Sequence, residues 1–162
     1  AKYPKEIKKF ELLMDKMPKR QYMAYYKGAI SFAQKNDVLK EDLLRRDFTI
    51  NALCINSSYE IIDYFDGIKD LNNKIIRAVG NPLNRFEEDA LRILRAIRFA
   101  VKFDFELDEK LEKSIYKNVR FLSHLNKDKI VSELNKSTKQ ELEKSKVYFN
   151  RFSIDIISNV LE

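Results

Sequence analysis

Residues that break regular structure are scarce in this chain. Its 162 residues include only 3 Gly and 3 Pro, while 44% are hydrophobic and 35% are charged. An all-β domain needs turn residues at most chain reversals, and a disordered chain would have fewer hydrophobic residues. The composition therefore predicts a globular, mainly helical protein of one domain, or of a small domain with a helical extension.

Apolar residues recur at helical spacing along much of the chain. Asp37 and Asp108 are suited to begin two helices, because an aspartate side chain can accept a hydrogen bond from a free backbone N–H. Residues 19–37 give a mixed signal, for a helix or for a strand at 29–33. The other predicted helices cover 4–17, 37–48, 84–101, the stretch after Asp108, 127–136 and much of 140–161.

Two short runs at 59–64 and 74–79 are rich in β-branched residues and flank the Asp66-Gly67 pair. Such runs around a turn-forming dipeptide predict a small hairpin or another two-stranded element. The fold class predicted from the whole pattern is α+β, mainly α-helical.

Charge and cysteine content limit the function classes. The chain carries 31 Lys and Arg against 25 Asp and Glu, which gives a net charge of +6 and modestly favours a polyanionic partner. A single cysteine and a single histidine exclude an internal disulfide framework and a Cys/His zinc site, and favour a cytoplasmic setting. No apolar run is long enough for a bilayer, and the start does not resemble a signal peptide, so we expect no membrane partner.

The most informative stretch is 85–99, with the sequence RFEEDALRILRAIRF. Asp89 and Arg92 lie three residues apart and would project from neighbouring positions of one helix. Cytosine and adenine present an amino donor beside a ring-nitrogen acceptor, which an aspartate and an arginine can match; uracil and guanine present the reverse. An ordinary ion pair on a helix surface explains the same spacing.

Longer motifs favour the functional interpretation. Residues 45–53, RRDFTINAL, are followed by 63–71, DYFDGIKDL, then by 76–80, IRAVG, and by the stretch 85–99. The run 126–136, NKDKIVSELNK, comes later. In order and approximate spacing these segments resemble the class II tRNA nucleotidyltransferases, the family of CCA-adding enzymes and poly(A) polymerases. The resemblance covers about residues 37 to 136.

The resemblance implies a fold and a division of the chain. Family members have a polymerase-β-like head that binds two metal ions, followed by a helical neck. Residues 37–80 would be the C-terminal part of the head, 81–162 the helical neck, and 1–36 an unassigned, helical segment.

The resemblance also implies roles for individual residues. Asp89 and Arg92 would select the base, Arg46 would contact the sugar or phosphates of the nucleotide, and Arg95 and Arg98 would support the pocket. For the RRDFTINAL motif, Asp47 and Asn51 are expected to fix its geometry through hydrogen bonds. Its apolar residues Phe48, Ile50 and Leu53, and the adjacent Cys54, are expected in the core.

One part of the family pattern has no match. A glycine-rich turn and a D-x-D pair, which would hold the triphosphate and Mg²⁺, do not precede Asp37, and no residue is assigned as a metal ligand or as catalytic. The downstream carboxylates at 63–66 and 104–108 lie inside or beside segments that match other parts of the family. The chain would thus be a fragment, a split enzyme completed by a complementary head segment, or a degenerate relative, and inactive alone.

The predicted function is template-independent addition of nucleotides from ATP and CTP to the 3′ end of tRNA or another RNA. The alternatives are a poly(A) polymerase of the same family, a non-catalytic module that binds RNA or nucleotides, and a purely structural helical domain.

Overall fold

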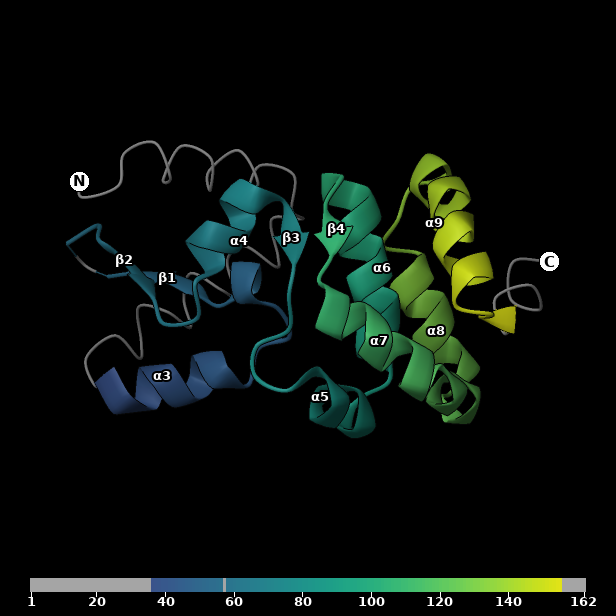
Figure 1. Cartoon of the computed structure of the whole chain (residues 1–162), viewed down its shortest axis with the longest axis horizontal. Helices are drawn as coiled ribbons and strands as arrows, with labels where there is room; N and C mark the ends of the chain where they lie inside the picture. Colours follow the sequence, from purple (N-terminus) through teal and green to yellow (C-terminus); the bar gives the residue numbers. More distant parts are fainter. Residues whose placement is uncertain (1–35, 57, 156–162) are drawn as a thin grey trace. The chain divides into compact units, whose positions relative to one another are not determined.

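The computed structural model describes residues 36–56 and 58–155. Its contacts divide the chain into two compact units, Ala1–Lys69 and Asp70–Glu162, whose boundary falls within helix α4 (Figure 1). The helix expected over 4–17 and the strand expected over 29–33 lie outside the described residues. The description of the first unit therefore begins at residue 36.

The first unit contains short elements joined by tight turns. They are α3 (Asn36–Leu44), the 3-10 helix η1 (Thr49–Asn51), β1 (Leu53–Ile55), β2 (Ile61–Asp63) and the first turn of α4 (Gly67–Asn73).

Helix α3 is described from Asn36, so Asp37 lies inside it and does not cap it, and it ends at Leu44, before the predicted end at residue 48. The amides of Arg45 and Arg46 donate to carbonyls three residues earlier, which tightens the chain into a turn. Phe48 then adopts an extended conformation, with φ −126° and ψ 151°. The RRDFTINAL motif consequently lies beside the helix and not on it.

The predicted strands exist, but they do not pair with each other. β2 pairs antiparallel with β1, with Cys54 opposite Ile62. β3 (Ile75–Ile76) lies in the second unit and pairs parallel with β4 (Glu106–Leu107). The expected hairpin between 59–64 and 74–79 is therefore wrong, because helix α4 occupies the connection between these runs.

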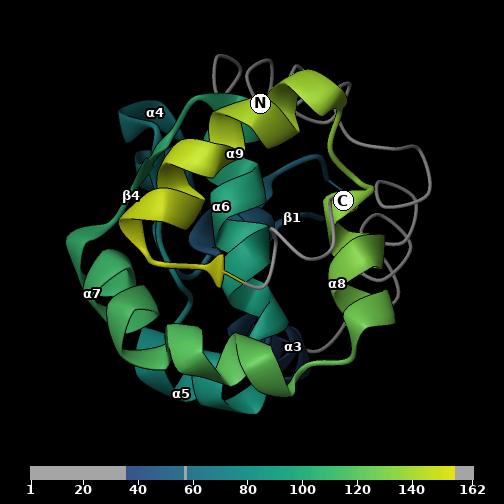
Figure 2. The ribbon, with the colours of Figure 1, turned by 90° about the vertical axis from the view of Figure 1, so that its right-hand side faces the viewer.

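The second unit is mainly helical. Its helices are α5 (Pro82–Glu88), α6 (Leu91–Phe103), α7 (Glu109–Asn118), the 3-10 helix η2 (Val119–His124), α8 (Lys127–Leu134) and α9 (Lys139–Arg151). Figure 2 shows α6 in the middle of this unit, with α5, α7, α8 and α9 around it. α6 packs directly against α5, α8 and α9.

Caps and apolar faces explain why these helices form where they do. The Asp108 carboxylate accepts from the amides of Lys110 and Leu111, which confirms the predicted start of α7. Thr138 and Glu141 form a capping box at the start of α9. α9 ends at Arg151, before the predicted end near residue 161; residues 156–162 lie outside the described residues.

The core of this unit is apolar and surrounds α6. The α6 residues Ile93, Ala96 and Ile97 are completely buried, as are Leu111 and Ile115 of α7. The structure confirms the predicted mainly helical α+β class. Among the described residues, no helix has the length and apolar character required to cross a bilayer.

Candidate nucleotide-selecting site

The RRDFTINAL motif is held together by Asp47, which is buried. Its Oδ1 accepts from the backbone amide of Phe48 at 2.9 Å and from the side-chain amide of Asn51 at 3.1 Å. These bonds fix the turn between α3 and η1, as predicted for Asp47 and Asn51. The burial of Phe48, Ile50 and Leu53 confirms that the apolar residues of the motif are core residues.

Arg46 lies in the same turn and is only partly exposed. Its Nη2 donates to Oδ2 of Asp42 at 2.9 Å, one helical turn earlier in α3. Its side chain is 25% exposed. Such a group can bind a phosphate, because a guanidinium can donate to two oxygens at once.

Cys54 follows the motif in β1 and is buried, as predicted. Burial raises the pKa of its thiol to about 11, against a smaller lowering by the charge of Arg46. The thiol is therefore protonated near neutral pH, and a core residue is the simplest interpretation of it.

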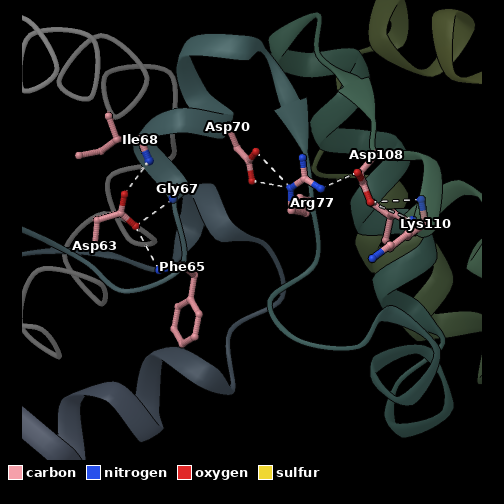
Figure 3. Close-up of polar contacts among 9 residues, drawn as sticks. Asp63, Phe65, Gly67, Ile68, Asp70, Arg77, Asp108 and Lys110 are labelled. Atoms are coloured by element: carbon pink, nitrogen blue, oxygen red, sulfur yellow. Dashed lines mark hydrogen bonds and ion pairs between the residues drawn. The ribbon is translucent and has the colours of Figure 1, made fainter.

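The DYFDGIKDL segment is organised by Asp63 at the end of β2. Figure 3 shows its carboxylate facing the amides of Phe65, Gly67 and Ile68, and Oδ1 accepts from Gly67 at 2.8 Å while Oδ2 accepts from Ile68 at 3.0 Å. Asp63 thus satisfies the free N–H groups at the start of α4.

Gly67 is required where α4 begins, because the backbone of η1 approaches it closely. A Cβ on residue 67 would lie 2.3 Å from the carbonyl oxygen of Thr49. The glycine of this segment and the RRDFTINAL motif are therefore spatially dependent on each other, which explains why both occur in one pattern.

Arg77 plays a similar organising part in the second unit (Figure 3). Its Nε donates to both oxygens of Asp70, at 3.2 and 3.0 Å, and its Nη1 donates to Oδ1 of Asp108 at 2.6 Å. Arg77 thereby connects α4, β3 and the start of α7. No role was predicted for Asp70 or Arg77, although both lie inside the quoted motifs.

The carboxylates of these segments do not form a Mg²⁺ site. Both oxygens of Asp63 accept backbone N–H groups, and Asp108 is engaged by Arg77 and by the cap of α7. Within the part of the chain that the structure describes, no group of three His, Cys, Asp or Glu side chains is placed to hold a metal ion. The described residues therefore do not fit the two-metal centre that the resemblance implies.

Asp89 does not lie on a continuous helix with Arg92, contrary to the prediction for 84–101. α5 ends at Glu88 and α6 begins at Leu91; Asp89 between them is extended, with φ −154° and ψ 98°. Its Oδ1 accepts from the amide of Leu91 at 3.0 Å, and its carbonyl accepts from the amide of Arg92 at 3.1 Å. An aspartate favours such a break because its side chain can replace a helical hydrogen bond.

Arg92 is in the first turn of α6 and is partly buried, with its side chain 18% exposed. Its Nη1 lies 3.5 Å from Oε2 of Glu88, and the same oxygen accepts from Nη1 of Arg85 at 3.2 Å. Arg85 in turn donates from Nε to the carbonyl of Val79. Glu88 and Arg85 thus help to orient Arg92, a contribution that the i, i+3 and i, i+4 spacings of 85, 88 and 92 could have indicated.

Arg95 and Arg98 lie further along α6. The guanidinium of Arg95 is 5.9 Å from the centre of the Phe99 ring. Arg98 is buried, and its Nε donates to Oε1 of Glu133 in α8 at 2.8 Å. Oε2 of Glu133 also accepts from Lys136.

Charge balance around Glu133 follows from these contacts. Burial acts to raise the pKa of its carboxyl, but the hydrogen bonds and positive charges of Lys136 and Arg98 outweigh burial and lower the pKa below its usual value. Glu133 is therefore ionised at neutral pH, and its pair with Arg98 ties α6 to α8 inside the second unit. A small cavity beside the pair is lined in part by Ser137, Leu142 and Phe149.

The structure brings Asp89, Arg92, Arg95 and Arg98 onto α6 and its N-terminal junction, whereas Arg46 belongs to the first unit. Comparisons with known proteins match part of this chain. The family model of the poly(A) polymerase head domain matches residues 5–77. The CCA-adding enzyme of Pediococcus pentosaceus is 51% identical over 98 residues, which are 60% of this chain and 25% of that enzyme. The chain is therefore similar to the CCA-adding enzymes and to the poly(A) polymerase head domain.

Solved structures of this family agree with the match. The CCA-adding enzyme of Bacillus stearothermophilus in complex with CTP superposes with a TM-score of 0.59 at 42% identity, over 60% of this chain and 25% of that one. The Thermotoga maritima CCA-adding enzyme complexed with tRNA gives a TM-score of 0.63 at 34% identity, over 72% of this chain and 30% of that one.

These similarities confirm the resemblance seen in the motifs. The chain spans about a quarter of the length of the curated relatives it matches. The match to the head domain begins at residue 5, inside the segment 1–36 that had no assignment from its sequence. The division into head and neck at residue 80 stays a prediction.

Proposed function

We propose that this chain supplies the nucleotide-selecting part of a template-independent RNA nucleotidyltransferase, which adds nucleotides from ATP and CTP to the 3′ end of tRNA. The observation that carries the proposal is the exposed carboxylate of Asp89 at the break between α5 and α6. Leu91 holds its Oδ1, which leaves Oδ2 unpaired within the described part of the chain.

A fixed carboxylate beside a guanidinium distinguishes the bases by hydrogen-bond polarity. Asp89 can accept from the amino group of cytosine or adenine, while Arg92 donates to the neighbouring ring nitrogen. Uracil and guanine would set their carbonyl oxygen against the carboxylate and leave polar groups unpaired. Each such mismatch costs about 1–3 kcal/mol, or roughly fivefold to 150-fold in affinity.

The position of Arg92 supports this assignment. Its side chain is 18% exposed and approaches Glu88, which also binds Arg85. A guanidinium held in this way loses little conformational freedom when a base binds. Arg95 and Arg98 would support the pocket from α6, and Arg46 would contact the sugar or phosphates.

The described residues alone do not supply every group that the complete transfer reaction needs. Relatives include a CCA-adding enzyme solved with CTP and one solved with tRNA, which supports these ligands for the family. Mg²⁺ would supply charge stabilisation at the phosphates, and no step is assigned to a metal held by the described residues. The proposal includes a complementary head segment that completes the enzyme. It also includes a cytoplasmic location, which the single cysteine suggests.

Titration calorimetry with ATP, CTP, UTP and GTP tests the proposal, with and without Mg²⁺. We expect ATP and CTP to bind more tightly than UTP and GTP, and the preference to disappear in Asp89→Ala. Glu87→Ala is the matched control, because Glu87 is an exposed carboxylate on α5 close to Asp89. Equal affinity for all four nucleotides, or the same loss in both variants, would contradict base selection by Asp89.

A further inference from the structure

Helix α7 presents a row of basic side chains to solvent, and η2 continues it. Lys110, Lys113 and Lys117 are all exposed and lie at positions i, i+3 and i+7, which share one face of a helix. The helix packs inwards through residues such as Leu111, which is completely buried. Arg120 in η2 is exposed as well. These four cations, Lys110, Lys113, Lys117 and Arg120, form the α7 basic row.

Most of the positive charge of the α7 basic row is not neutralised. Lys113 binds Glu109, but both side chains are mainly exposed, at 68% and 79%, and such pairs contribute little. Within the described residues, Lys110, Lys117 and Arg120 have no carboxylate partner. The row therefore offers several cations to an incoming polyanion.

The length of the α7 basic row suits a phosphate backbone. A helix rises about 1.5 Å per residue, so Lys110 and Lys117 are separated by roughly 10 Å along the axis. One strand of a nucleic-acid duplex presents a phosphate about every 3.4 Å of axis. The three lysines can thus lie along about three successive phosphates of one strand.

The aromatic residues near the row already contact other side chains, although Tyr116 is 51% exposed. The Tyr116 ring packs edge-on against Phe152, with centroids 4.8 Å apart. The Phe121 ring is covered by the guanidinium of Arg120, 5.1 Å from its centroid. Surfaces for single-stranded RNA usually add exposed aromatic rings to basic residues, whereas double-helical RNA is bound mainly through its backbone.

We infer that the α7 basic row binds the phosphate backbone of a double-helical RNA segment. The inference rests on the proposed function only for the RNA substrate, since nucleotide selection is assigned to Asp89 and Arg92. Contacts to phosphates position an RNA without reading its sequence. The row would therefore hold the stem of an RNA whose 3′ end is to be extended.

The test compares binding of a short RNA duplex and of one of its strands to the full chain, by fluorescence anisotropy over a series of salt concentrations. The variant is Lys110→Gln, Lys113→Gln and Lys117→Gln combined. The control removes equal charge from α9 with Lys139→Gln, Lys144→Gln and Lys146→Gln, exposed lysines on a helix that also carries glutamates. Melting temperatures establish that both variants remain folded.

We expect the duplex to bind more tightly than the strand. The plot of log affinity against log salt should become shallower by about 2–3 in the α7 variant and change much less in the control, because each phosphate contact contributes about 0.9 to the slope. Equal losses in the two variants, or tighter binding of the strand, would overturn the inference.

A second titration separates this inference from the proposed function. The α7 variant should retain the nucleotide preference of the unaltered chain, and Asp89→Ala should retain its affinity for the duplex. If Asp89→Ala lost duplex binding while the α7 variant kept it, the RNA-binding surface would not lie on α7. That result would overturn the inference but would not contradict base selection by Asp89 and Arg92.

Discussion

Arg98 and Glu133 form a buried ion pair that joins α6 to α8. Nε of Arg98 is 2.8 Å from Oε1 of Glu133, and the two side chains are only 6% and 1% exposed. Nη2 of Arg98 is also buried and has no hydrogen-bonding partner among the described residues. Arg98 therefore depends strongly on Glu133, and removal of the glutamate would leave a buried, uncompensated guanidinium.

We predict that Glu133→Ala lowers the free energy of unfolding by about 3–5 kcal/mol, because breaking one side of a buried pair strands the other charge. Urea denaturation followed by circular dichroism measures the change. Glu143→Ala is the control, since Glu143 is 68% exposed and pairs with the exposed Lys146; we expect a change below about 1 kcal/mol there. Equal effects of the two substitutions would contradict the importance of the buried pair.

Acid stability should report on the same carboxylate. The pKa of Glu133 is lower in the folded chain than its ordinary value of 4.5, so its ionised form stabilises the fold above that pH. This contribution is lost as the pH falls from about 4.5 through the folded-state pKa. The melting temperature should fall as the pH is lowered from neutral into this acidic range, and Glu133→Gln should weaken this dependence on pH. An unchanged dependence in the variant would argue against an ionised Glu133.

Gly67→Ala should destabilise the first unit. The new Cβ would meet the carbonyl oxygen of Thr49 at 2.3 Å, so α4 or η1 must move. Overpacking of this kind typically costs about 1–3 kcal/mol. Lys69→Ala, on an exposed position of the same helix, controls for changes in helix propensity. Thermal unfolding of both variants checks the prediction, and equal melting temperatures would contradict the close approach.

The Cys54 thiol should be almost unreactive while the chain is folded. It is 5% exposed, and burial raises its pKa to about 11, so little thiolate exists at mildly alkaline pH. The rate of labelling by a thiol-specific disulfide reagent should rise by orders of magnitude on unfolding in urea. Labelling of the folded chain at the rate of a free thiol would show that Cys54 is accessible.

Much of the fold follows from local sequence patterns. Asp108 as a helix cap and the burial of Phe48 and Ile50 are as predicted, because caps and apolar spacing act over a few residues. The pairing of β3 with β4 joins residues about thirty positions apart, and no local pattern specifies it. Strand partners therefore depend on tertiary packing that a single sequence does not display.

The candidate site shows the same division. Its residues Asp89 and Arg92 were found from the motif, yet the break at Asp89 was missed, because the helix predicted over 84–101 rested on the apolar spacing of Ala90, Ile93 and Ile97, which all lie after it. An aspartate before an apolar run is also a signal for a helix start. The apolar spacing over 84–101 favoured one continuous helix, so this signal for a helix start at Asp89 was not followed.

The most direct test of base selection uses the amide of Leu91, which donates to Asp89 in the free chain. In ¹⁵N-correlated NMR spectra of the full chain, CTP should shift the signals of Leu91 and Arg92, while UTP at the same concentration should shift them little. Asp89→Asn keeps the side-chain shape but replaces one acceptor by a donor, so its preference should move towards UTP. Equal shifts with CTP and UTP in the unaltered chain, and no change in Asp89→Asn, would contradict the account.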